Sequence, residues 1–327
     1  MRGALPALAL VLGIAVTPVD AAGDGPQPRS GTIAVAAGVE VRHARWDPPA
    51  PPRATVVMLP GRTEPIEKYR AIAGDFLARG FVVFMLDWRG QGLSTRTPGT
   101  GQAQHVDDYA DYQADLDAVL DRVVAPAGTP DGWLLFGHSM GGHVALRHLA
   151  RGDPRVRAAV LSAPMTDIHV GDLPRPLAEG AAWTAARAGL ARRYAPGQED
   201  HDAAEPFAGN RLSGDERRWR AALDLWAKDP RLVVGGVTFG WLDATFRSIA
   251  VLRAPGVPER IRQPVLMLIA PEDRIVVAAS QRALAARMPD AEVVALDGSG
   301  HEPFFERDAI RDGAWAAVDR FLGRTRF

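Results

Sequence analysis

The sequence contains no cysteine among its 327 residues, which excludes disulfide bonds, thiolate metal sites and a cysteine nucleophile. It also lacks an excess of either charge. With 38 basic and 39 acidic residues the net charge is −1, so no overall positive field attracts nucleic acid or an anionic membrane. Hydrophobic residues make up 47% of the chain and charged residues 24%, which is typical of a globular protein. The length allows one large core, or a core with an inserted subdomain.

The apolar run near the N-terminus is too short to span a bilayer as a mature helix. It covers residues 4–16, follows a single basic residue, Arg2, and is interrupted by Pro6 and Gly13. Small residues up to position 21 then match the spacing that a signal peptidase uses. We therefore predict that residues 1–22 are a cleaved signal peptide and that the protein is periplasmic or secreted. The alternative is an apolar leader on a cytoplasmic or membrane-associated protein.

Strands and helices alternate through the first half of the chain. Residues 32–35 and 39–46 predict a hairpin around Gly38. Continuous apolar runs then predict strands buried on both faces of a parallel sheet, and apolar residues at helical spacing lie between them. The strands are expected at 54–59, 81–86, 133–136 and 158–161, and the helices at 66–77, 109–123 and after residue 139. This order predicts an open parallel sheet that helices cover on both faces.

The alternation stops after residue 164 and resumes at 263. Residues 165–262 contain no predicted buried strand but several helical fragments rich in aromatic residues. We predict a helical cap here, inserted between the first part of the core (23–164) and the second (263–327). A cap of this size cannot bury all of its aromatic residues, so we expect some in its own core and others along an apolar channel. In the second part, strands are expected at 265–269 and 292–296, a helix at 277–288 and a terminal helix from about 310.

Gly137-His138-Ser139-Met140-Gly141 has the pattern G-x-S-x-G between a predicted strand and a predicted helix. In that setting the motif forms a sharp turn that exposes the serine hydroxyl above the sheet. The glycines are needed because larger side chains would collide across the turn. Ser139 is therefore the candidate nucleophile.

A serine hydroxyl needs a base to take its proton, and the base needs a carboxylate to orient it. The order serine, acid, histidine fits Asp273, which follows the strand at 265–269, and His301, in a glycine-rich loop after the last strand. Both are expected at the sheet edge that carries Ser139. For the acid, Glu272 is adjacent and Asp167 is a second alternative.

The oxyanion of an acyl-transfer intermediate needs backbone N–H donors. The expected donors are Met140, which follows the nucleophile, and Arg62, in the loop after the strand at 54–59. The side chain of Arg62 has two interpretations, a contact with an anionic head group or a solvated loop arginine. The loop at 87–94, with an acid and two glycines, is interpreted as a structural turn that braces its neighbour.

Several stretches resemble the α/β-hydrolase superfamily, and within it the branch of lysophospholipases and monoacylglycerol lipases, the serine aminopeptidase S33 type. The matching stretches are residues 59–64, 86–92, 137–142, 301–308 and, in the cap, Gly235-Gly236-Val237-Thr238-Phe239-Gly240-Trp241-Leu242, which is similar to bacterial lysophospholipase L2. One departure is Pro60, where many relatives have histidine; the backbone supplies the donor, so we expect little effect on catalysis.

The resemblance implies an α/β-hydrolase fold, with a mostly parallel eight-stranded sheet, helices on both faces and an inserted helical cap. It implies a triad of Ser139, Asp273 and His301, an oxyanion hole at Arg62 and Met140, and no metal or cofactor. The expected substrate is a single-chain acyl ester, a lysophospholipid or monoacylglycerol, with a transient contact between cap and membrane surface. No nucleic-acid partner is expected, and the oligomeric state stays open.

Three other functions remain open from the residues alone. A peptidase of the proline-aminopeptidase type shares the triad and needs acidic cap residues for a free amino terminus, for which Glu179, Glu199 and Glu205 are available. An acyltransferase differs only in the acceptor of the acyl group. A non-catalytic binding protein on the same fold is the remote alternative.

Overall fold

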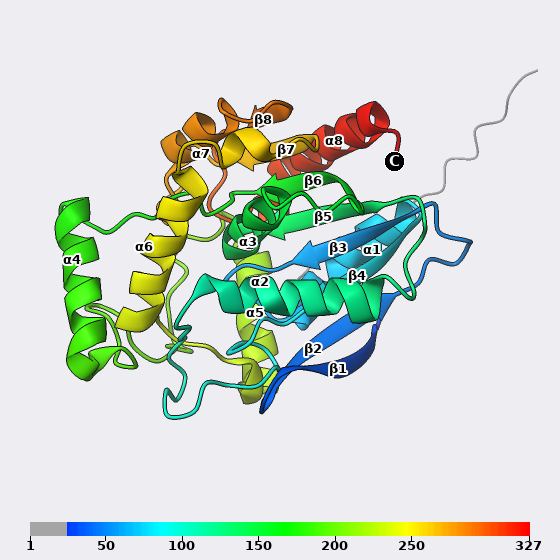
Figure 1. Ribbon diagram of the computed structural model, residues 1–327. Coiled ribbons are helices and arrows are strands. Elements are labelled where there is room, and N and C mark those ends of the chain that lie inside the picture. Colours follow the sequence, from blue (N-terminus) through cyan, green and yellow to red (C-terminus); the bar gives the residue numbers. More distant parts are fainter. Residues whose placement is uncertain (1–24) are drawn as a thin grey trace, which may run out of the picture.

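The computed structural model describes residues 25–327 (Figure 1), so the predicted signal peptide lies outside the described residues. One sheet has the strand order β1-β2-β4-β3-β5-β6-β7-β8. Strand β2 pairs antiparallel with β1 and β4, and all other neighbours are parallel. The strands are β1 (Arg29–Ala36), β2 (Val39–Trp46), β3 (Ala54–Leu59), β4 (Phe81–Leu86), β5 (Trp133–His138), β6 (Val156–Ser162), β7 (Val265–Ile269) and β8 (Ala291–Ala295).

Helices lie on both faces of this sheet, as Figure 1 shows. They are α1 (Arg70–Ala78), α2 (Tyr109–Val119), α3 (Ser139–Leu149), α4 (Arg175–Ala185), α5 (Glu216–Lys228), α6 (Phe239–Arg253), α7 (Ala278–Ala285) and α8 (Asp308–Thr325). Short 3-10 or π turns are η1 (Ile66–Tyr69), η2 (Leu120–Val124), η3 (Ala186–Leu190), η4 (Pro230–Leu232), η5 (Pro258–Arg260) and η6 (Pro303–Phe305). The predicted α/β-hydrolase fold, an eight-stranded and mostly parallel sheet with helices on both faces, is confirmed.

The two faces of the sheet build two separate cores. In β3, Val57 and Leu59 pack in the core beneath α2, α3 and α7, whereas Val56 and Met58 pack in the core beneath α1 and α8. All six residues of β3 are buried, as are those of β4 and β5. This explains why these strands appear in the sequence as continuous apolar runs rather than as alternating patterns.

The segment between β6 and β7, residues 165–262, carries α4, α5 and α6 and is named the cap segment here. Helix α4 lies against α6 and away from the sheet (Figure 1). Thr238 is the N-cap of helix α6, and its hydroxyl accepts a hydrogen bond from the amide of Trp241 at 3.1 Å. The inner side of α6 contributes Trp241, Ala244 and Leu252 to the core that contains α2 and α3.

Most predicted element bounds agree with the structure within two residues, and the differences have local causes. The predicted helix at 66–77 is divided into η1 and α1, and the helix at 109–123 changes from α to π geometry after Val119. The predicted helix at 277–288 ends already at Ala285, because the chain turns there into β8. The helical periodicity of the sequence does not distinguish a tighter 3-10 turn or a wider π turn from an α-helix.

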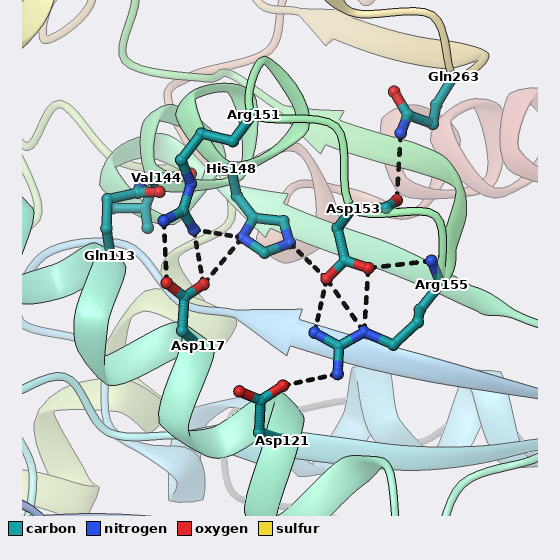
Figure 2. A network of polar contacts seen from close by, with 9 residues as sticks. All are labelled: Gln113, Asp117, Asp121, Val144, His148, Arg151, Asp153, Arg155 and Gln263. Carbon is teal, nitrogen blue, oxygen red and sulfur yellow. Dashed lines mark hydrogen bonds and ion pairs between the residues drawn. The ribbon is translucent and has the colours of Figure 1, made fainter.

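An ion-pair network ties the C-terminal end of α3 to α2 and to the loop before β6 (Figure 2). His148 lies between two carboxylates, with Nε2 3.1 Å from Asp153 and Nδ1 3.3 Å from Asp117. Arg151 donates to both oxygens of Asp117, at 2.6 and 2.9 Å. Burial would raise the pKa of Asp117, but the hydrogen bonds from His148 and Arg151 lower it to about 2. Ser139 is the first residue of α3, so this network holds the opposite, C-terminal end of the helix that carries the candidate nucleophile.

Candidate active site

Ser139 lies in a strained turn between β5 and α3. Its φ angle is +48°, in the left-handed region that few non-glycine residues adopt. A Cβ atom on Gly141 would lie 2.1 Å from the carbonyl oxygen of Leu59, and one on Gly137 would lie 2.9 Å from the Cα of Gly142. Both contacts involve backbone that cannot move aside, so the sharp turn requires glycine at these positions. Strain of this kind is typical of functional sites.

The structure brings Ser139, His301 and Asp273 into one hydrogen-bonded chain. His301 Nε2 lies 2.9 Å from Ser139 Oγ, and His301 Nδ1 lies 2.6 Å from Asp273 Oδ2. All three residues are buried. The second oxygen of Asp273 accepts hydrogen bonds from the amides of Ile275, at 2.7 Å, and Val276, at 3.0 Å. These two amides hold the carboxylate toward the imidazole.

The alternative acid residues lie elsewhere. Asp167 is paired with Arg175 and with Arg253, the latter at 2.8 Å, and Glu272 is exposed. Because parallel strands β7 and β8 end at the same edge as β5, the residues that follow them converge there. The structure therefore brings Asp273, and neither alternative, to His301.

The electrostatic environment favours a basic imidazole. Burial would lower the pKa of His301, but the charge and hydrogen bond of Asp273, together with the charges of Glu302 and Glu64, raise it overall. Burial would raise the pKa of Asp273, but His301 and two backbone amides lower it overall. A histidine held in this way can accept the proton of a serine hydroxyl and keep it during the reaction.

In the loop after β3, the amide of Arg62 has no hydrogen-bond partner among residues 25–327, whereas the amides on either side of it are bonded. Gly61 donates its N–H to Glu64 at 2.7 Å, and the amide of Thr63 donates to the side chain of Gln91 at 2.5 Å. The amide of Arg62 lies between them. Met140 is in the first turn of α3, where the helix itself offers no acceptor. The two predicted oxyanion donors are therefore available at the same edge of the sheet.

The loop at 87–94 braces this one, as predicted. Asp87 is buried and accepts hydrogen bonds from the amides of Ile66 and Leu93, each at 2.9 Å. It also pairs with Arg42 at 2.9 Å. Burial raises the pKa of Asp87 to about 6. These contacts hold the surrounding loops in place, so Asp87 fixes the start of η1 and does not take part in catalysis.

A buried network that the sequence analysis missed joins the oxyanion loop to the histidine loop. The ammonium of Lys68 lies 2.6 Å from Glu64 and 2.6 Å from Glu302. Glu64 also accepts from the amide of Gly61 and, at 2.6 Å, from the hydroxyl of Tyr69. Burial would lower the pKa of Lys68, but the two carboxylates raise it overall. The i, i+4 spacing of Glu64 and Lys68 was the only signal in the sequence, and it is common on exposed helices.

His138 lies beside the catalytic histidine rather than toward solvent. Its ring centroid is 4.8 Å from that of His301, and Nδ1 lies 3.0 Å from the carbonyl oxygen of Ser162. Burial lowers the pKa of His138 to about 4, so the ring is neutral at pH 7.

Glu64, His138 and Glu302 have donor atoms within 4.8 Å of one another, a spacing that could hold a metal ion. The ammonium of Lys68 already pairs with both carboxylates of this group.

One cavity reaches Ser139, and a second, whose lining residues all belong to the cap segment, adjoins it. One, of about 200 Å³, is lined by Ser139 and Met140. The other, of about 390 Å³, is lined mostly by apolar side chains of the cap segment. The residues that line both cavities are Ile168, His169, Gln198, Arg211, Val237 and Leu242. The larger volume is within the usual range for a ligand pocket.

The aromatic residues of the cap segment have both of the predicted roles. Trp219 is buried against Phe207, with ring centroids 5.5 Å apart, and the ring of Trp226 packs on His201. Trp241 lines the smaller cavity, and Phe239 and Phe246 line the larger one. Trp183 contributes to neither role, since it is 51% exposed.

Comparison with known proteins gives consistent matches. The sequence model of the serine aminopeptidase S33 family matches residues 50–308. Lysophospholipase L2 of Escherichia coli K12 is 32% identical over 278 residues, which cover 82% of this chain and 80% of that protein. Monoacylglycerol lipase of Mycolicibacterium smegmatis is 27% identical, over 82% of this chain and 88% of that protein. A soluble variant of monoglyceride lipase from Saccharomyces cerevisiae has a TM-score of 0.71 at 17% identity, covering 92% of this chain and 97% of that structure.

Proposed function

Because the chain belongs to the serine aminopeptidase S33 family, we propose that it is a serine carboxylic-ester hydrolase that cleaves single-chain acyl lipids, either lysophospholipids or monoacylglycerols. The observation that carries the proposal is the hydrogen-bonded chain of Ser139, His301 and Asp273 beside an apolar cavity. Two relatives named for such substrates, a lysophospholipase and a monoacylglycerol lipase, support the substrate class.

In the proposed reaction, Ser139 Oγ attacks the acyl carbonyl carbon while His301 Nε2 takes the hydroxyl proton. The amides of Arg62 and Met140 donate hydrogen bonds to the oxyanion. His301 then gives its proton to the leaving glycerol oxygen, and the ester bond breaks. Water repeats the sequence on the acyl-enzyme and releases the fatty acid. Asp273 keeps the imidazole in one tautomer and stabilises its cation. No step requires a metal or cofactor.

The other enzyme functions have less support. A peptidase that binds a free amino terminus needs a carboxylate near the nucleophile, and no Asp or Glu is among the described residues that line the cavity at Ser139. Of the three candidate carboxylates, Glu179 is paired with Arg175 at 2.7 Å on the surface. An acyltransferase uses the same acyl-enzyme, so only the acceptor distinguishes it. The intact triad argues against a non-catalytic binding protein.

Release of fatty acid from octanoyl esters of glycerol and of glycerophosphates tests the proposal. Ser139→Ala is expected to lower kcat by about 10⁴-fold or more, whereas Ser30→Ala, on the exposed strand β1, serves as the matched control. Retained activity in Ser139→Ala discards the mechanism. Cleavage of proline arylamides in place of the esters indicates a peptidase. With added glycerol, transfer of the acyl group to glycerol instead of water indicates an acyltransferase.

We also propose that the cap segment contacts the membrane surface transiently. The large apolar side chains that are exposed within residues 25–327 all belong to it: Leu173, Leu177, Trp183, Leu190 and Val251. Among helices of the described chain, none has both the length and the apolar character needed to cross a bilayer. In the variant Leu177→Ser/Trp183→Ser, turnover of a vesicle-borne ester is expected to fall relative to turnover of a soluble ester. An unchanged ratio contradicts the contact.

The export of the protein stays a prediction from residues 1–22. Sequencing the N-terminus of the protein from the cell that makes it tests the prediction, because cleavage gives a chain that begins near residue 23. A mature chain that begins at Met1 contradicts it.

A further inference from the structure

The cavity beside Ser139 is lined by basic side chains as well as apolar ones. Its walls include Arg62, Arg211, Arg274 and His169, and no Asp or Glu lines it among the described residues. The neighbouring larger cavity is lined mainly by alanine, leucine, valine and phenylalanine side chains. The mainly apolar cavity and the cavity at Ser139 share part of their walls, and Arg211 and His169 belong to that shared part.

Each of the three arginines is attached to a loop of the catalytic site. Arg62 is on the oxyanion loop, and Arg274 directly follows Asp273. Arg211 precedes Leu212, whose carbonyl oxygen accepts a hydrogen bond from the amide of Glu302 at 2.8 Å. This bond fixes the backbone beside Arg211 against the loop of His301. The backbone positions of the three arginines relative to Ser139 are thus set by the oxyanion loop and by the loops that position Asp273 and His301.

These charges have no carboxylate partner within residues 25–327. No ion pair there involves Arg62, Arg211 or Arg274, although many other arginines of the described chain are paired. Arg211 and Arg274 are exposed. Arg62 is half-buried and donates one hydrogen bond from Nη1 to the carbonyl oxygen of Gly235, at 2.9 Å.

The arrangement has an electrostatic cost. Burial lowers the pKa of Arg62; nearby tyrosines and Glu64 act against this, and the positive charge of Arg211 lowers the pKa further. Two guanidinium groups that repel each other beside a nucleophile are stabilised when an anion enters between them, because each can then donate charge-assisted hydrogen bonds. Arginine forks match the geometry of phosphate oxygens.

We propose that Arg62, Arg211 and Arg274 bind the phosphodiester of a lysophospholipid head group, while its acyl chain occupies the apolar cavity. The inference rests on the proposed ester hydrolysis and selects between its two substrate classes. In a lysophospholipid the phosphate is separated from the scissile ester only by the glycerol carbons. The cavity at Ser139 adjoins the larger apolar cavity, so the phosphate can lie among the arginines while the acyl chain occupies the neighbouring space. A monoacylglycerol leaves the three arginines without an anion.

The test compares two esters with the same octanoyl chain below their micellar concentrations, octanoyl lysophosphatidylglycerol and 1-octanoylglycerol. The wild-type protein is expected to have the higher kcat/KM for the phosphodiester. In Arg211→Met, the ratio of the two kcat/KM values is expected to fall about tenfold or more, the usual effect of losing a hydrogen bond to a charged group. The double variant Arg211→Met/Arg274→Met is expected to lower the ratio further. Arg122→Met, at an exposed arginine on η2, should leave the ratio unchanged.

A binding measurement separates this inference from the proposed function, since it needs no turnover. Ser139→Ala is expected to bind octanoyl lysophosphatidylglycerol more tightly than 1-octanoylglycerol, and the added substitution Arg211→Met should reduce the difference about tenfold or more. If neither ester is hydrolysed by the wild-type protein but this preference is found, the proposed function is wrong and the anion site stands. If the esters are hydrolysed but Arg211→Met changes neither the kcat/KM ratio nor the preference in binding, the anion site is wrong and the hydrolase stands.

Discussion

Replacing Lys68 by methionine tests whether one buried ammonium holds the two halves of the site together. Lys68 contacts Glu64, next to the oxyanion loop, and Glu302, next to His301, at 2.6 Å each. Methionine fills a similar volume but leaves two buried carboxylates without their counter-charge. Removing one partner of a buried ion pair costs about 3–5 kcal/mol, so the free energy of unfolding at pH 7 should fall by that amount.

The loss in the free energy of unfolding of Lys68→Met should depend on pH in a defined direction. Burial and the charge of Glu64 raise the pKa of Glu302 already in the wild-type protein, although Lys68 opposes this. Without Lys68 the pKa of Glu302 rises further above its unfolded value. A raised carboxyl pKa gives stability that is present at low pH and lost as the pH rises through the folded pKa. The deficit of Lys68→Met should therefore be larger at pH 8 than at pH 5.

Urea unfolding at both pH values, combined with kcat on a soluble p-nitrophenyl ester, provides the assay. The double variant Lys68→Met/Glu302→Gln should recover part of the stability, because Glu64 keeps its bonds from Gly61 and Tyr69. Lys228→Met, at an exposed lysine of α5, controls for the substitution itself. A loss below about 1 kcal/mol, the range of surface pairs, or a double variant no more stable than the single one would refute the reasoning.

Three further predictions concern the same site and its support. In Glu302→Gln, the acid limb of the kcat/KM profile should move to lower pH, because Glu302 is one of the charges that raise the pKa of His301; an unmoved limb contradicts this. Burial lowers the pKa of His143 to about 3, so its stability contribution is present above pH 6.5 and is lost as the pH falls. Between pH 6.5 and 4 the loss is about 3 kcal/mol, and urea unfolding of His143→Gln should show a flatter pH dependence. Gly141→Ala should lower kcat by about 100-fold or more, since the added Cβ meets the carbonyl oxygen of Leu59 at 2.1 Å.

Gly180→Ala is the matched control for the glycine substitution, because a Cβ at Gly180 in α4 has no neighbour within 4 Å. It should keep full activity and a thermal midpoint at least equal to that of the wild-type protein. For the histidine prediction, an equally steep pH dependence in His143→Gln would mean that other groups cause the loss of stability at low pH.

The sequence alone predicted the sheet and the three residues that the structure brings into one hydrogen-bonded chain. Strands buried on both faces have continuous apolar runs, so β3, β4 and β7 were predicted with their observed bounds. Parallel strands end at one edge, so residues that follow β5, β7 and β8 had to meet there. Ser139, Asp273 and His301 were therefore predicted together without any knowledge of side-chain contacts.

Only the tertiary structure decided what surrounds the triad. The contacts of Lys68 with Glu302 and of Arg62 with Gly235 join residues 234 and 173 positions apart. No periodicity predicts such pairs, because the pattern of buried and exposed residues records which face of an element is covered, not what covers it. The sequence predicted Asp273 and left Asp167 as an alternative, and the contacts that separate the two are also tertiary. A carboxylate after either strand satisfies the topology, and only the packing of the cap segment pairs Asp167 with Arg175 and Arg253.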